Sequence, residues 1–320
     1  MQTFDRLVTV FGGSGFVGRH VVRALAKRGL RIRVAVRRPD LAGHLQPLGA
    51  VGQIHAVQAN LRYPDSVRQA VAGAEIVINC VGILYETGRQ KFDSVQARGA
   101  AAVARAAAEA GARLIHISAI GADADSAALY ARTKAAGEAA VREAAPDAVI
   151  LRPSIVFGPE DDFFNRFAAM AQMSPVLPLV GGGETKFQPV FVGDLADAVM
   201  AAVDGKTKPG ATYEIGGPAV KNFRELLELV LKTTQRNRLL VPLPFGLARL
   251  QAKVLQLLPK PMLTEDQVEL LKSDNVVSEA AKAEGRTLEG LGIHPQSVEA
   301  IVPGYLWRFR KQGQFAEPAR

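Results

Sequence analysis

The sequence predicts an α/β fold, in which a doubly wound parallel sheet carries a smaller, mainly helical C-terminal lobe. In the first half of the chain, short runs of β-branched residues alternate with alanine-rich stretches of helical length, a pattern typical of βαβ units. After Pro153 this alternation ends and proline and glycine become frequent, which indicates that the chain leaves the sheet. We therefore expect one domain over residues 1–155, to which the chain returns near 187–216, and a lid or lobe over 156–320.

The elements of the first domain can be placed from these patterns. Strands are expected at Leu7–Phe11, Arg31–Val36, Ile54–Gln58, Ile76–Cys80, Leu114–Ser118 and Ala148–Leu151. Helices are expected between them, at Gly15–Arg28, Asp65–Ala72, Phe92–Ala110 and Ala127–Ala144. Right-handed crossovers would join these strands into one sheet. Beyond it, Thr212–Ile215 reads as a further strand and Asn222–Thr233 as a helix.

Composition excludes several classes of protein. The chain has 320 residues, of which 48% are hydrophobic and 22% charged, as in an ordinary globular protein. The sequence contains no run of eighteen apolar residues, so it predicts no membrane-spanning helix. A single cysteine excludes a disulfide framework, and the five histidines lack metal-ligand spacing, so we expect no metal site.

An aromatic content of 6% gives little support for nucleic-acid binding, whereas the net charge of +8 favours anionic partners. Because the strand pattern begins at Leu7, we also expect no presequence, and the lone cysteine agrees with a reducing compartment.

A glycine-rich turn follows the first strand. In Val8–Gly18 a strand, a turn and a helix start follow one another directly, with glycine at positions 12, 15 and 18. Gly12 permits the tight turn, Gly15 lets backbone approach a pyrophosphate, and Gly18 lets the helix pack closely on the sheet. The free N–H groups of the first helical turn bind phosphate together with the helix dipole. The expected cofactor contacts are Gly12, Ser14, Gly15, Phe16 and Val17.

The Gly-x-x-Gly-x-x-Gly spacing resembles that of the extended and atypical short-chain dehydrogenase/reductase families, whose nucleotide-binding domain has a Rossmann-type sheet. The second strand ends in Arg37 and Arg38, where an NAD-selective member usually carries an acidic residue for the ribose diol. Guanidinium groups suit a 2′-phosphate instead. The resemblance therefore implies NADPH (NADP) as the cofactor, in preference to NAD.

Two further segments are similar to cofactor-lining segments of these families. Asn60 and Leu61, after the third strand, stand where the families usually carry Asp-Leu near the adenine. After the fourth strand, Cys80, Val81 and Gly82 resemble the segment that lines the cofactor's ribose.

Tyr130 and Lys134 match the Tyr-x-x-x-Lys motif of the families and share one face of a helix. In the families the lysine lowers the tyrosine's pKa and binds the nicotinamide ribose. Active members usually place a serine or threonine hydroxyl just past the fifth strand. Here Ser118 remains as an expected cofactor contact, but Ala119 occupies the hydroxyl position, a loss that typically costs about a hundredfold in rate. We expect the pair to position a cofactor without turnover.

The segment Leu151–Pro159 resembles the Arg-Pro…Tyr-Gly-Pro segment that closes over the nicotinamide. It implies contacts from Pro153 and Ile155, while Phe157 replaces the usual tyrosine. The acids at 160–162 could be read as a metal or acid–base site, but they are more simply explained as charges that complement the N-terminus of a helix over Phe163–Ala171.

Taken together, these motifs are similar to one branch of the atypical members, the nucleotide-binding accessory subunit of respiratory complex I (NADH:ubiquinone oxidoreductase). The resemblance extends over nearly the whole chain and is strongest from Gly12 to Asp197. It implies a tightly held NADPH with a structural or assembly role, and other subunits of complex I as partners. It also implies a peripheral location in the respiratory chain, on the cytoplasmic side of the bacterial inner membrane or on the matrix side in mitochondria.

A C-terminal stripe bears on this independently. Between Pro244 and Pro259, one helical face carries Leu247, Leu250, Val254, Leu257 and Leu258, with Arg249 and Lys253 on its flank. The stripe suits docking on anionic lipid headgroups or on a partner subunit, and equally a helix packed on its own core. The basic and aromatic tail around Trp307, with Arg308, Phe309, Arg310 and Lys311, suits contact with a partner or with lipid headgroups, and equally a solvated terminus.

Two alternatives remain open at this point. Retention of Tyr130 and Lys134 fits an active NADP-dependent reductase, epimerase or dehydratase. A redox-sensing regulator of the same fold would instead require reversible exchange of NADP forms.

Overall fold

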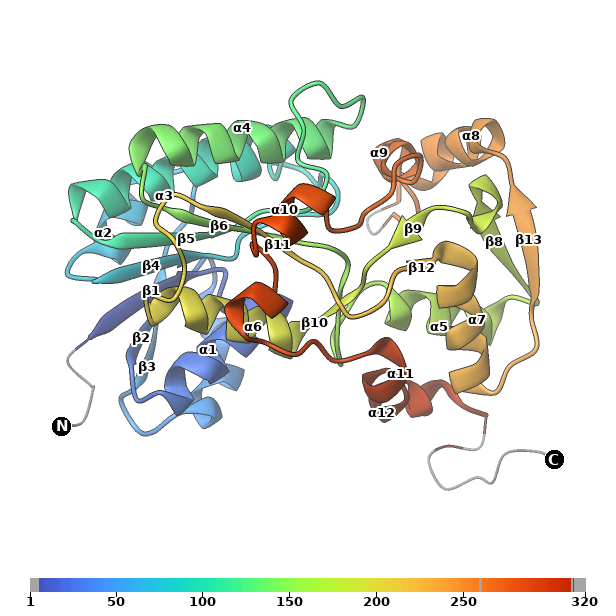
Figure 1. Cartoon of the computed structure of the whole chain (residues 1–320), viewed down its shortest axis with the longest axis horizontal. Helices are drawn as coiled ribbons and strands as arrows, with labels where there is room; N and C mark the ends of the chain where they lie inside the picture. The colour runs from blue at the N-terminus through green and yellow to red at the C-terminus, as the bar shows by residue number, and fades with distance from the viewer. Residues whose placement is uncertain (1–5, 259–260, 312, 314–320) are drawn as a thin grey trace. The chain divides into compact units, whose positions relative to one another are not determined.

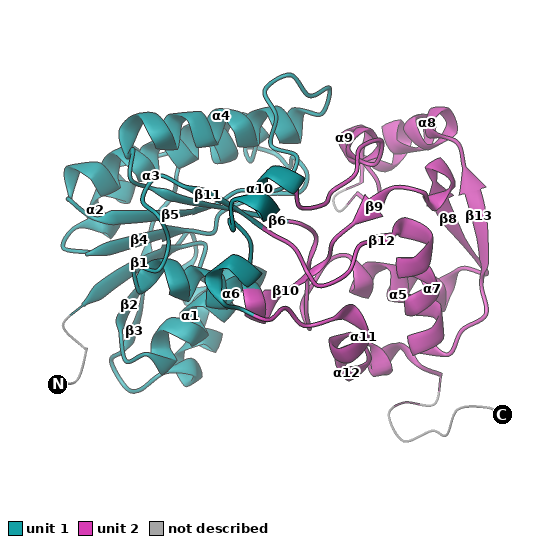
Figure 2. Ribbon diagram, in the orientation of Figure 1, with its two compact units in different colours: residues 1–153, 195–214, 279–293 teal, residues 154–194, 215–278, 294–320 magenta. Residues whose placement is uncertain are grey.

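The computed structural model describes residues 6–258, 261–311 and 313 and divides the chain into two compact units (Figure 2). Unit 1 comprises residues 1–153, 195–214 and 279–293, and unit 2 comprises residues 154–194, 215–278 and 294–320. The sequence analysis anticipates a return of the chain to the first domain near 187–216. It does not anticipate the second return at 279–293.

Unit 1 is a seven-stranded sheet covered by helices on both faces (Figure 1). Its strands are β1 (Leu7–Phe11), β2 (Arg31–Val36), β3 (Ile54–Gln58), β4 (Ile76–Asn79), β5 (Arg113–Ile117), β6 (Val149–Pro153) and β11 (Thr212–Ile215). Its α-helices are α1 (Phe16–Lys27), α2 (Pro64–Val71), α3 (Arg98–Glu109), α4 (Leu129–Ala144), α6 (Val192–Val203) and α10 (Glu279–Ala283). Its shorter helices are η1 (Pro39–Leu48), η2 (Asp93–Ala97) and η4 (Glu289–Leu291).

The strand order is β11-β6-β5-β4-β1-β2-β3, and β1 to β6 pair in parallel. Helices α2, α3 and α4 cover one face of the sheet, and α1 and α6 cover the other (Figure 1). Strands β1, β4, β5 and β6 are almost entirely buried, because helices lie on both sides of them. The order reverses between β1 and β4, and ligands of such sheets bind at that point, beyond the carboxyl ends of the strands. The predicted doubly wound fold is confirmed.

The observed elements of unit 1 follow the predicted ones with small shifts. Strand β4 ends at Asn79 rather than at Cys80, so the thiol belongs to the following loop. The single helix expected over Phe92–Ala110 is divided into the π-helical turn η2 and α3. Gly137 of α4 lies against this turn, where a Cβ would come within 2.2 Å of the backbone oxygen of Gln96. The close approach of two backbones explains a glycine inside α4.

Unit 2 is a set of helices around three two-stranded sheets, β10-β7, β12-β9 and β13-β8. Its strands are β7 (Val156–Phe157), β8 (Val176–Val180), β9 (Lys186–Phe187), β10 (Val190–Phe191), β12 (Lys221–Asn222) and β13 (Leu239–Leu243). Its helices are α5 (Phe164–Met173), η3 (Gly181–Gly183), α7 (Phe223–Thr234), α8 (Phe245–Leu255), α9 (Glu265–Leu270), α11 (Val298–Ile301), α12 (Pro303–Leu306) and η5 (Trp307–Phe309). Most of its regular structure is helical, as predicted for the lobe.

The core of unit 2 is aromatic and aliphatic. Phe163, Phe167 and Phe223 meet edge to face, with ring centroids 5.2 to 6.1 Å apart. Helix α7 starts with a capping box, in which Asn222 accepts from the backbone N–H of Glu225 and the glutamate accepts in return from the N–H of Asn222.

Candidate functional site

The glycine turn after β1 has the conformation that a phosphate-binding loop needs. Gly12 adopts a φ of +73°, which side-chain-bearing residues rarely take. A Cβ at Gly18 would lie 2.2 Å from the carbonyl oxygen of Gly12 and 2.6 Å from Gly13 Cα, so α1 and the loop are in backbone contact. No side chain of a described residue caps α1, and no acidic residue occupies its first turn. The helix N-terminus is thus available to a negatively charged group.

The two arginines after β2 are not equivalent. Arg38 is bound by the Asp40 carboxylate, with Nε–Oδ1 and Nη2–Oδ2 distances of 3.0 and 2.7 Å. This pairing raises the pKa of Arg38 and lowers that of Asp40. Arg37 is exposed and is not held by any such carboxylate among the described residues. Of the expected pair, Arg37 therefore has the guanidinium that is available to a 2′-phosphate.

The loops after β3 and β4 lie at the same edge of the sheet. The Asn60 side-chain oxygen accepts from the backbone N–H of Arg62 at 3.1 Å, which engages the acceptor expected near the adenine. Leu61 packs against the core of unit 1 and against Gly99. Val81 contacts Gly12, because a Cβ on that glycine would lie 3.1 Å from Val81 Cγ2. The β1 and β4 loops therefore adjoin, as cofactor binding at the sheet's reversal point requires.

Lys134 joins α4 to the loops after β4 and β5. Its Nζ donates to the carbonyl oxygen of Ile117 at 3.3 Å, and a Cβ on Gly82 would lie 3.5 Å from it. Tyr130 lies one turn earlier on α4, half-buried, with its ring edge to face against Phe92 at 5.8 Å. The predicted Tyr-x-x-x-Lys pair is thus on the helix that covers the β4 and β5 loops.

Burial shifts the pKa values of Lys134 and of the neighbouring Cys80. Desolvation lowers the pKa of Lys134 to about 8, and the charge of Glu138 opposes this fall. Burial also raises the pKa of the half-buried Cys80 thiol to about 12, although the Lys134 charge favours the thiolate. Cys80 therefore behaves as a small packed side chain and not as a nucleophile.

The depressed pKa of Lys134 predicts a pH dependence of nucleotide affinity. Below pH 8 the ammonium attracts the anionic nucleotide, and above it the neutral amine does not. We expect the affinity for a reduced nicotinamide dinucleotide to fall roughly tenfold as the pH rises from about 7 to about 9.5, measured by fluorescence titration. Lys134→Met should bind more weakly throughout and show no inflection near pH 8. If the inflection persists in that variant, a different group causes it.

Two residues follow β5 where the sequence analysis looks for a catalytic hydroxyl, Ser118 and Ala119. Ser118 is buried, and its backbone N–H donates to Leu151 O at 2.7 Å within the sheet. Ala119, the next residue, offers no hydrogen-bond donor from its side chain. The side chain of Ser118 is therefore part of the interior of unit 1.

The last two expected contacts fall in different units. Pro153 ends β6, and its carbonyl oxygen accepts from Ile120 at 2.9 Å, which ties the loops after β5 and β6 together. Ile155 and Phe157 belong to unit 2 and pack in its aromatic core. Asp161 accepts from the backbone N–H of Asn165 at 3.1 Å, near the N-terminus of α5, whose first turn itself carries no acidic residue.

A buried polar pair beneath the site is absent from the sequence-based expectations. Asn79 and His116 face each other across β4 and β5, with Asn79 Nδ2 donating to His116 Nδ1 at 3.2 Å. Asn79 Oδ1 then accepts from the backbone N–H of Val81 at 3.1 Å. Burial, with the neighbouring Lys134 charge, lowers the pKa of His116 to about 3, so this histidine is neutral. A polar residue in each of two otherwise apolar strands is the signal that could have revealed the pair.

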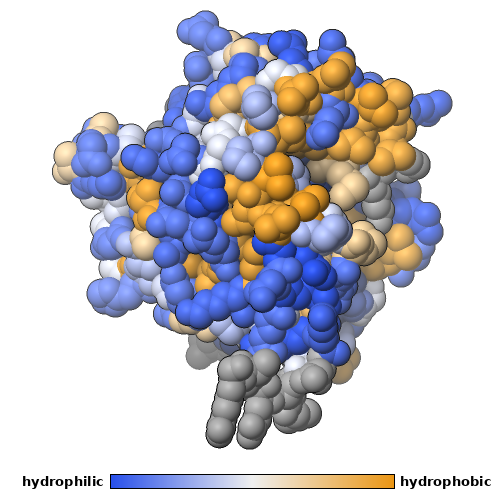
Figure 3. Space-filling view, turned by 90° about the vertical axis from the view of Figure 1, so that its right-hand side faces the viewer, coloured by the Kyte–Doolittle hydropathy of each residue, from blue (hydrophilic) through white to orange (hydrophobic). Residues whose placement is uncertain are grey.

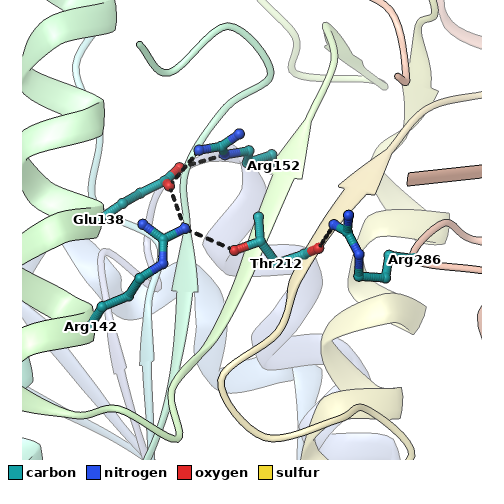
Figure 4. A network of polar contacts seen from close by, with 5 residues as sticks. All are labelled: Glu138, Arg142, Arg152, Thr212 and Arg286. Atoms are coloured by element: carbon teal, nitrogen blue, oxygen red, sulfur yellow. Dashed lines mark hydrogen bonds and ion pairs between the residues drawn. The ribbon is translucent and has the colours of Figure 1, made fainter. Parts of the chain in front are cut away.

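A second buried feature holds α4 to the sheet (Figure 4). The Glu138 carboxylate accepts from Arg152 Nε and Nη2 at 2.8 and 2.7 Å and from Arg142 Nη2 at 3.1 Å. Arg142 also donates to the hydroxyl of Thr212, and Arg286 donates to the carbonyl oxygen of Thr212. Burial raises the pKa of Glu138, but the hydrogen bonds and charges of the arginines outweigh it, and the net pKa is lowered. Because Glu138 lies one turn beyond Lys134, the network fixes the helix that carries the lysine.

Metal-binding side chains do not gather among the described residues. These residues contain no group of three or more His, Cys, Asp or Glu side chains that could hold a metal ion. No helix that they form combines the length and apolar character needed to cross a membrane.

The loop, the strand order and the motif on α4 define a nucleotide-binding sheet of the extended short-chain dehydrogenase type. Residues 8–216 match the family model described as the NAD dependent epimerase/dehydratase family, and the chain belongs to this family. The fold is also that of the dTDP-glucose 4,6-dehydratase DesIV from Streptomyces venezuelae, solved with NAD and TYD bound. The TM-score is 0.70 at 19% identity, over 95% of this chain and 96% of that one.

Within the family, the chain is similar to a subunit of respiratory complex I. It is 36% identical over 320 residues to the mitochondrial NADH dehydrogenase (ubiquinone) 1 alpha subcomplex subunit 9 of Arabidopsis thaliana, covering 96% of this chain and 79% of that protein. It is also 39% identical over 195 residues to a ceramide reductase of Caulobacter vibrioides, covering 61% of this chain and 60% of that enzyme.

Proposed function

We propose that the protein is an NADPH-binding accessory subunit of respiratory complex I, which holds its nucleotide as a structural cofactor and does not turn it over. The observation that carries the proposal is the similarity over 96% of the chain to a complex I subunit. Ala119 supports the absence of turnover, because the side chain that would polarise a substrate carbonyl is lacking. The partners are other complex I subunits. The location is peripheral, on the cytoplasmic side of a bacterial inner membrane or on the matrix side in mitochondria.

The residues present fit the proposed cofactor. The uncapped N-terminus of α1 suits the pyrophosphate, and the exposed Arg37 suits a 2′-phosphate. Lys134 supplies a positive charge beside the β4 loop, where the resemblance places the nicotinamide ribose. A bound nucleotide stabilises the fold by mass action, by about 4 kcal/mol at a thousand times its dissociation constant.

Isolation from native membranes tests the assignment. A tagged chain should co-purify with complex I subunits from a detergent extract, and acid should release NADP(H) from the purified assembly in about one equivalent per chain. Recovery only as a free oligomer would contradict the complex I proposal. Recovery with the complex but with no pyridine nucleotide would contradict the cofactor proposal alone.

Arg37 and Arg38 form a matched pair that tests cofactor selectivity. Arg37→Ser should weaken NADPH binding at least about tenfold and leave NADH binding nearly unchanged, because one charge-assisted contact to the 2′-phosphate is lost. Arg38→Ser should have a smaller effect, since its guanidinium is already bound to Asp40. The measurement is fluorescence titration with both nucleotides. Equal losses for NADPH and NADH in Arg37→Ser would show that Arg37 does not read the 2′-phosphate.

The second candidate function is an active NADP-dependent reductase, epimerase or dehydratase. It is favoured by the retained Tyr130 and Lys134 and by the similarity to a ceramide reductase. Absorbance at the NADPH band, followed with a panel of long-chain and nucleotide-sugar carbonyl compounds, separates the two proposals. Turnover that Tyr130→Phe abolishes would establish the enzyme and contradict a purely structural cofactor.

A further inference from the structure

Exposed hydrophobic side chains are concentrated on one part of unit 2. Sixteen large hydrophobic residues are exposed among the described residues, and eight of them lie between positions 239 and 262. Figure 3 faces the side that carries β13 and α8 in Figure 1 and shows hydrophobic residues in neighbouring groups there. We name these eight residues the apolar face: Leu239, Val241, Leu247, Leu250, Val254, Leu257, Leu258 and Met262. Such a concentration marks an interaction surface.

Helix α8 buries small residues and exposes most of its large apolar ones, which is the opposite of an ordinary surface helix. Its fully buried residues are the small Ala248 and Ala252, which pack with Val180 and Val268. Phe245, at the start of the helix, packs on this cluster. The large residues of the stripe point outward, and Leu250 and Val254 are 63% and 67% exposed. An ordinary surface helix buries its large apolar side chains and exposes polar ones. The structure therefore decides against the reading in which this stripe packs on the core of its own lobe.

Strand β13 extends the apolar face. Leu240 turns inward to the core of unit 2, while Leu239 and Val241 are exposed on the other side of the strand. Leu243, at the end of that same side, packs against the cluster beneath α8. The strand pairs with β8 along its whole length, from Leu239 opposite Val176 to Leu243 opposite Val180. Val176 of β8 is itself exposed. The outward side of this small sheet is therefore aliphatic as well.

The segment that carries the apolar face is basic, although the acidic Glu265 of α9 contacts Arg249 and Gln256 of α8. Residues 235–262 contain five basic side chains and no acidic one. On α8, Arg249 is paired with Glu265 of α9 at 3.2 Å, whereas Lys253 is exposed, with no ion pair to a described residue. Arg238 anchors the start of β13 by donating to Ala171 O at 2.8 Å. The combination of aliphatic residues with basic neighbours is typical of segments that lie in a membrane interface.

We infer that α8 and the outward side of β13 seat unit 2 on the surface of an anionic lipid bilayer. The apolar face is built of Leu, Val and Met, without tryptophan or tyrosine, whereas protein–protein hot spots are rich in Trp, Tyr and Arg and poor in Leu and Val. A helix can enter the interface because its backbone hydrogen bonds are satisfied internally. Lys253 lies beside the stripe, where an ammonium meets the headgroup phosphates. The inference deepens the peripheral location in the proposed function, but it requires no complex I subunit.

Vesicle co-sedimentation of the purified full chain, loaded with NADPH, tests this inference without any partner protein. The chain should sediment with phosphatidylcholine–phosphatidylglycerol vesicles, less with phosphatidylcholine alone, and less as salt is raised. Leu250→Asp should lower the partition coefficient at least about tenfold, since a leucine side chain is lost from the lipid interface and a repelled charge is added. Lys253→Gln should lower it about fivefold.

Leu41→Asp is the matched control, because Leu41 is 65% exposed and lies in unit 1. It should sediment like the wild type, and all three variants should keep the wild-type melting temperature. The inference is overturned if the wild type stays in the supernatant with both vesicle types, or if Leu250→Asp and Leu41→Asp behave alike. Light scattering adds a third contrary result: a stable dimer that Leu250→Asp dissociates, without vesicle binding, would assign the apolar face to a second copy of the chain. Failure here leaves co-purification with complex I untouched, so the two proposals fail separately.

Discussion

Gly18→Val is expected to lower NADPH affinity at least about a hundredfold and to cost about 3 kcal/mol of unfolding free energy. The new side chain would start 2.2 Å from the Gly12 carbonyl oxygen and 2.6 Å from Gly13 Cα, both of which are backbone atoms that cannot turn aside. Helix α1 must then move away from the loop, which removes several charge-assisted hydrogen bonds to phosphate at once. Fluorescence titration and urea unfolding measure the two effects.

Gly43→Val is the control for this substitution. Gly43 lies in η1, a Cβ there meets nothing within 4 Å, and its φ is not positive. We expect wild-type affinity and a change in stability below about 1 kcal/mol. Unchanged NADPH affinity in Gly18→Val would show that the glycine turn is not the phosphate-binding element.

Arg152→Met is expected to destabilise the protein by about 3 kcal/mol in urea unfolding. The carboxylate side chain of Glu138 is only 1% exposed and would keep Arg142 as its remaining cationic partner, itself 46% exposed. When a buried carboxylate loses a partner that donated two hydrogen bonds, the free-energy cost of removing its charge from water is no longer offset. Because α4 carries Lys134, NADPH affinity should fall with stability.

The double variant Glu138→Leu with Arg152→Met tests this explanation. It removes the buried charge together with its partner, so it should be more stable than Arg152→Met alone. Arg68→Met is a surface comparison, since Arg68 pairs with Asp65 where both side chains are more than half exposed. Its expected cost is below about 1 kcal/mol. Equal costs for Arg68→Met and Arg152→Met would contradict the role assigned to the buried network.

The parts of the fold that could be predicted are those in which the residue pattern of a short segment matches its place in the folded structure, such as an apolar run in a buried strand. The buried strands of unit 1 read as β-branched runs, and the glycine turn between β1 and α1 has a conformational requirement that only glycine meets easily. The loops predicted to hold a nucleotide lie at one edge of the sheet, because β1 to β6 run parallel. Their contact with a cofactor stays a prediction.

The rest depends on partners far along the chain. Strand β8 contains Pro178 and pairs with β13, whose residues follow more than fifty positions later, so no local alternation marks either strand. Glu138 and Arg152 are ordinary charged residues in sequence, and only the packing of α4 on β6 makes them a buried pair. Likewise, the sequence of the stripe on α8 does not show whether its leucines are buried in the lobe or exposed. In the structure, the alanines on the opposite face of α8 are the buried ones, so the stripe is exposed.

The discontinuity of unit 1 has a consequence for biosynthesis. Residues 279–293 return to the sheet, where Glu214 N donates to Arg286 O at 2.9 Å and Leu288 is fully buried. A ribosome releases these residues only after most of the chain has been made, so the outer edge beside β11 is completed late. A fragment that stops at Pro153 would present an unfinished sheet margin, which is a hazard for self-association during synthesis.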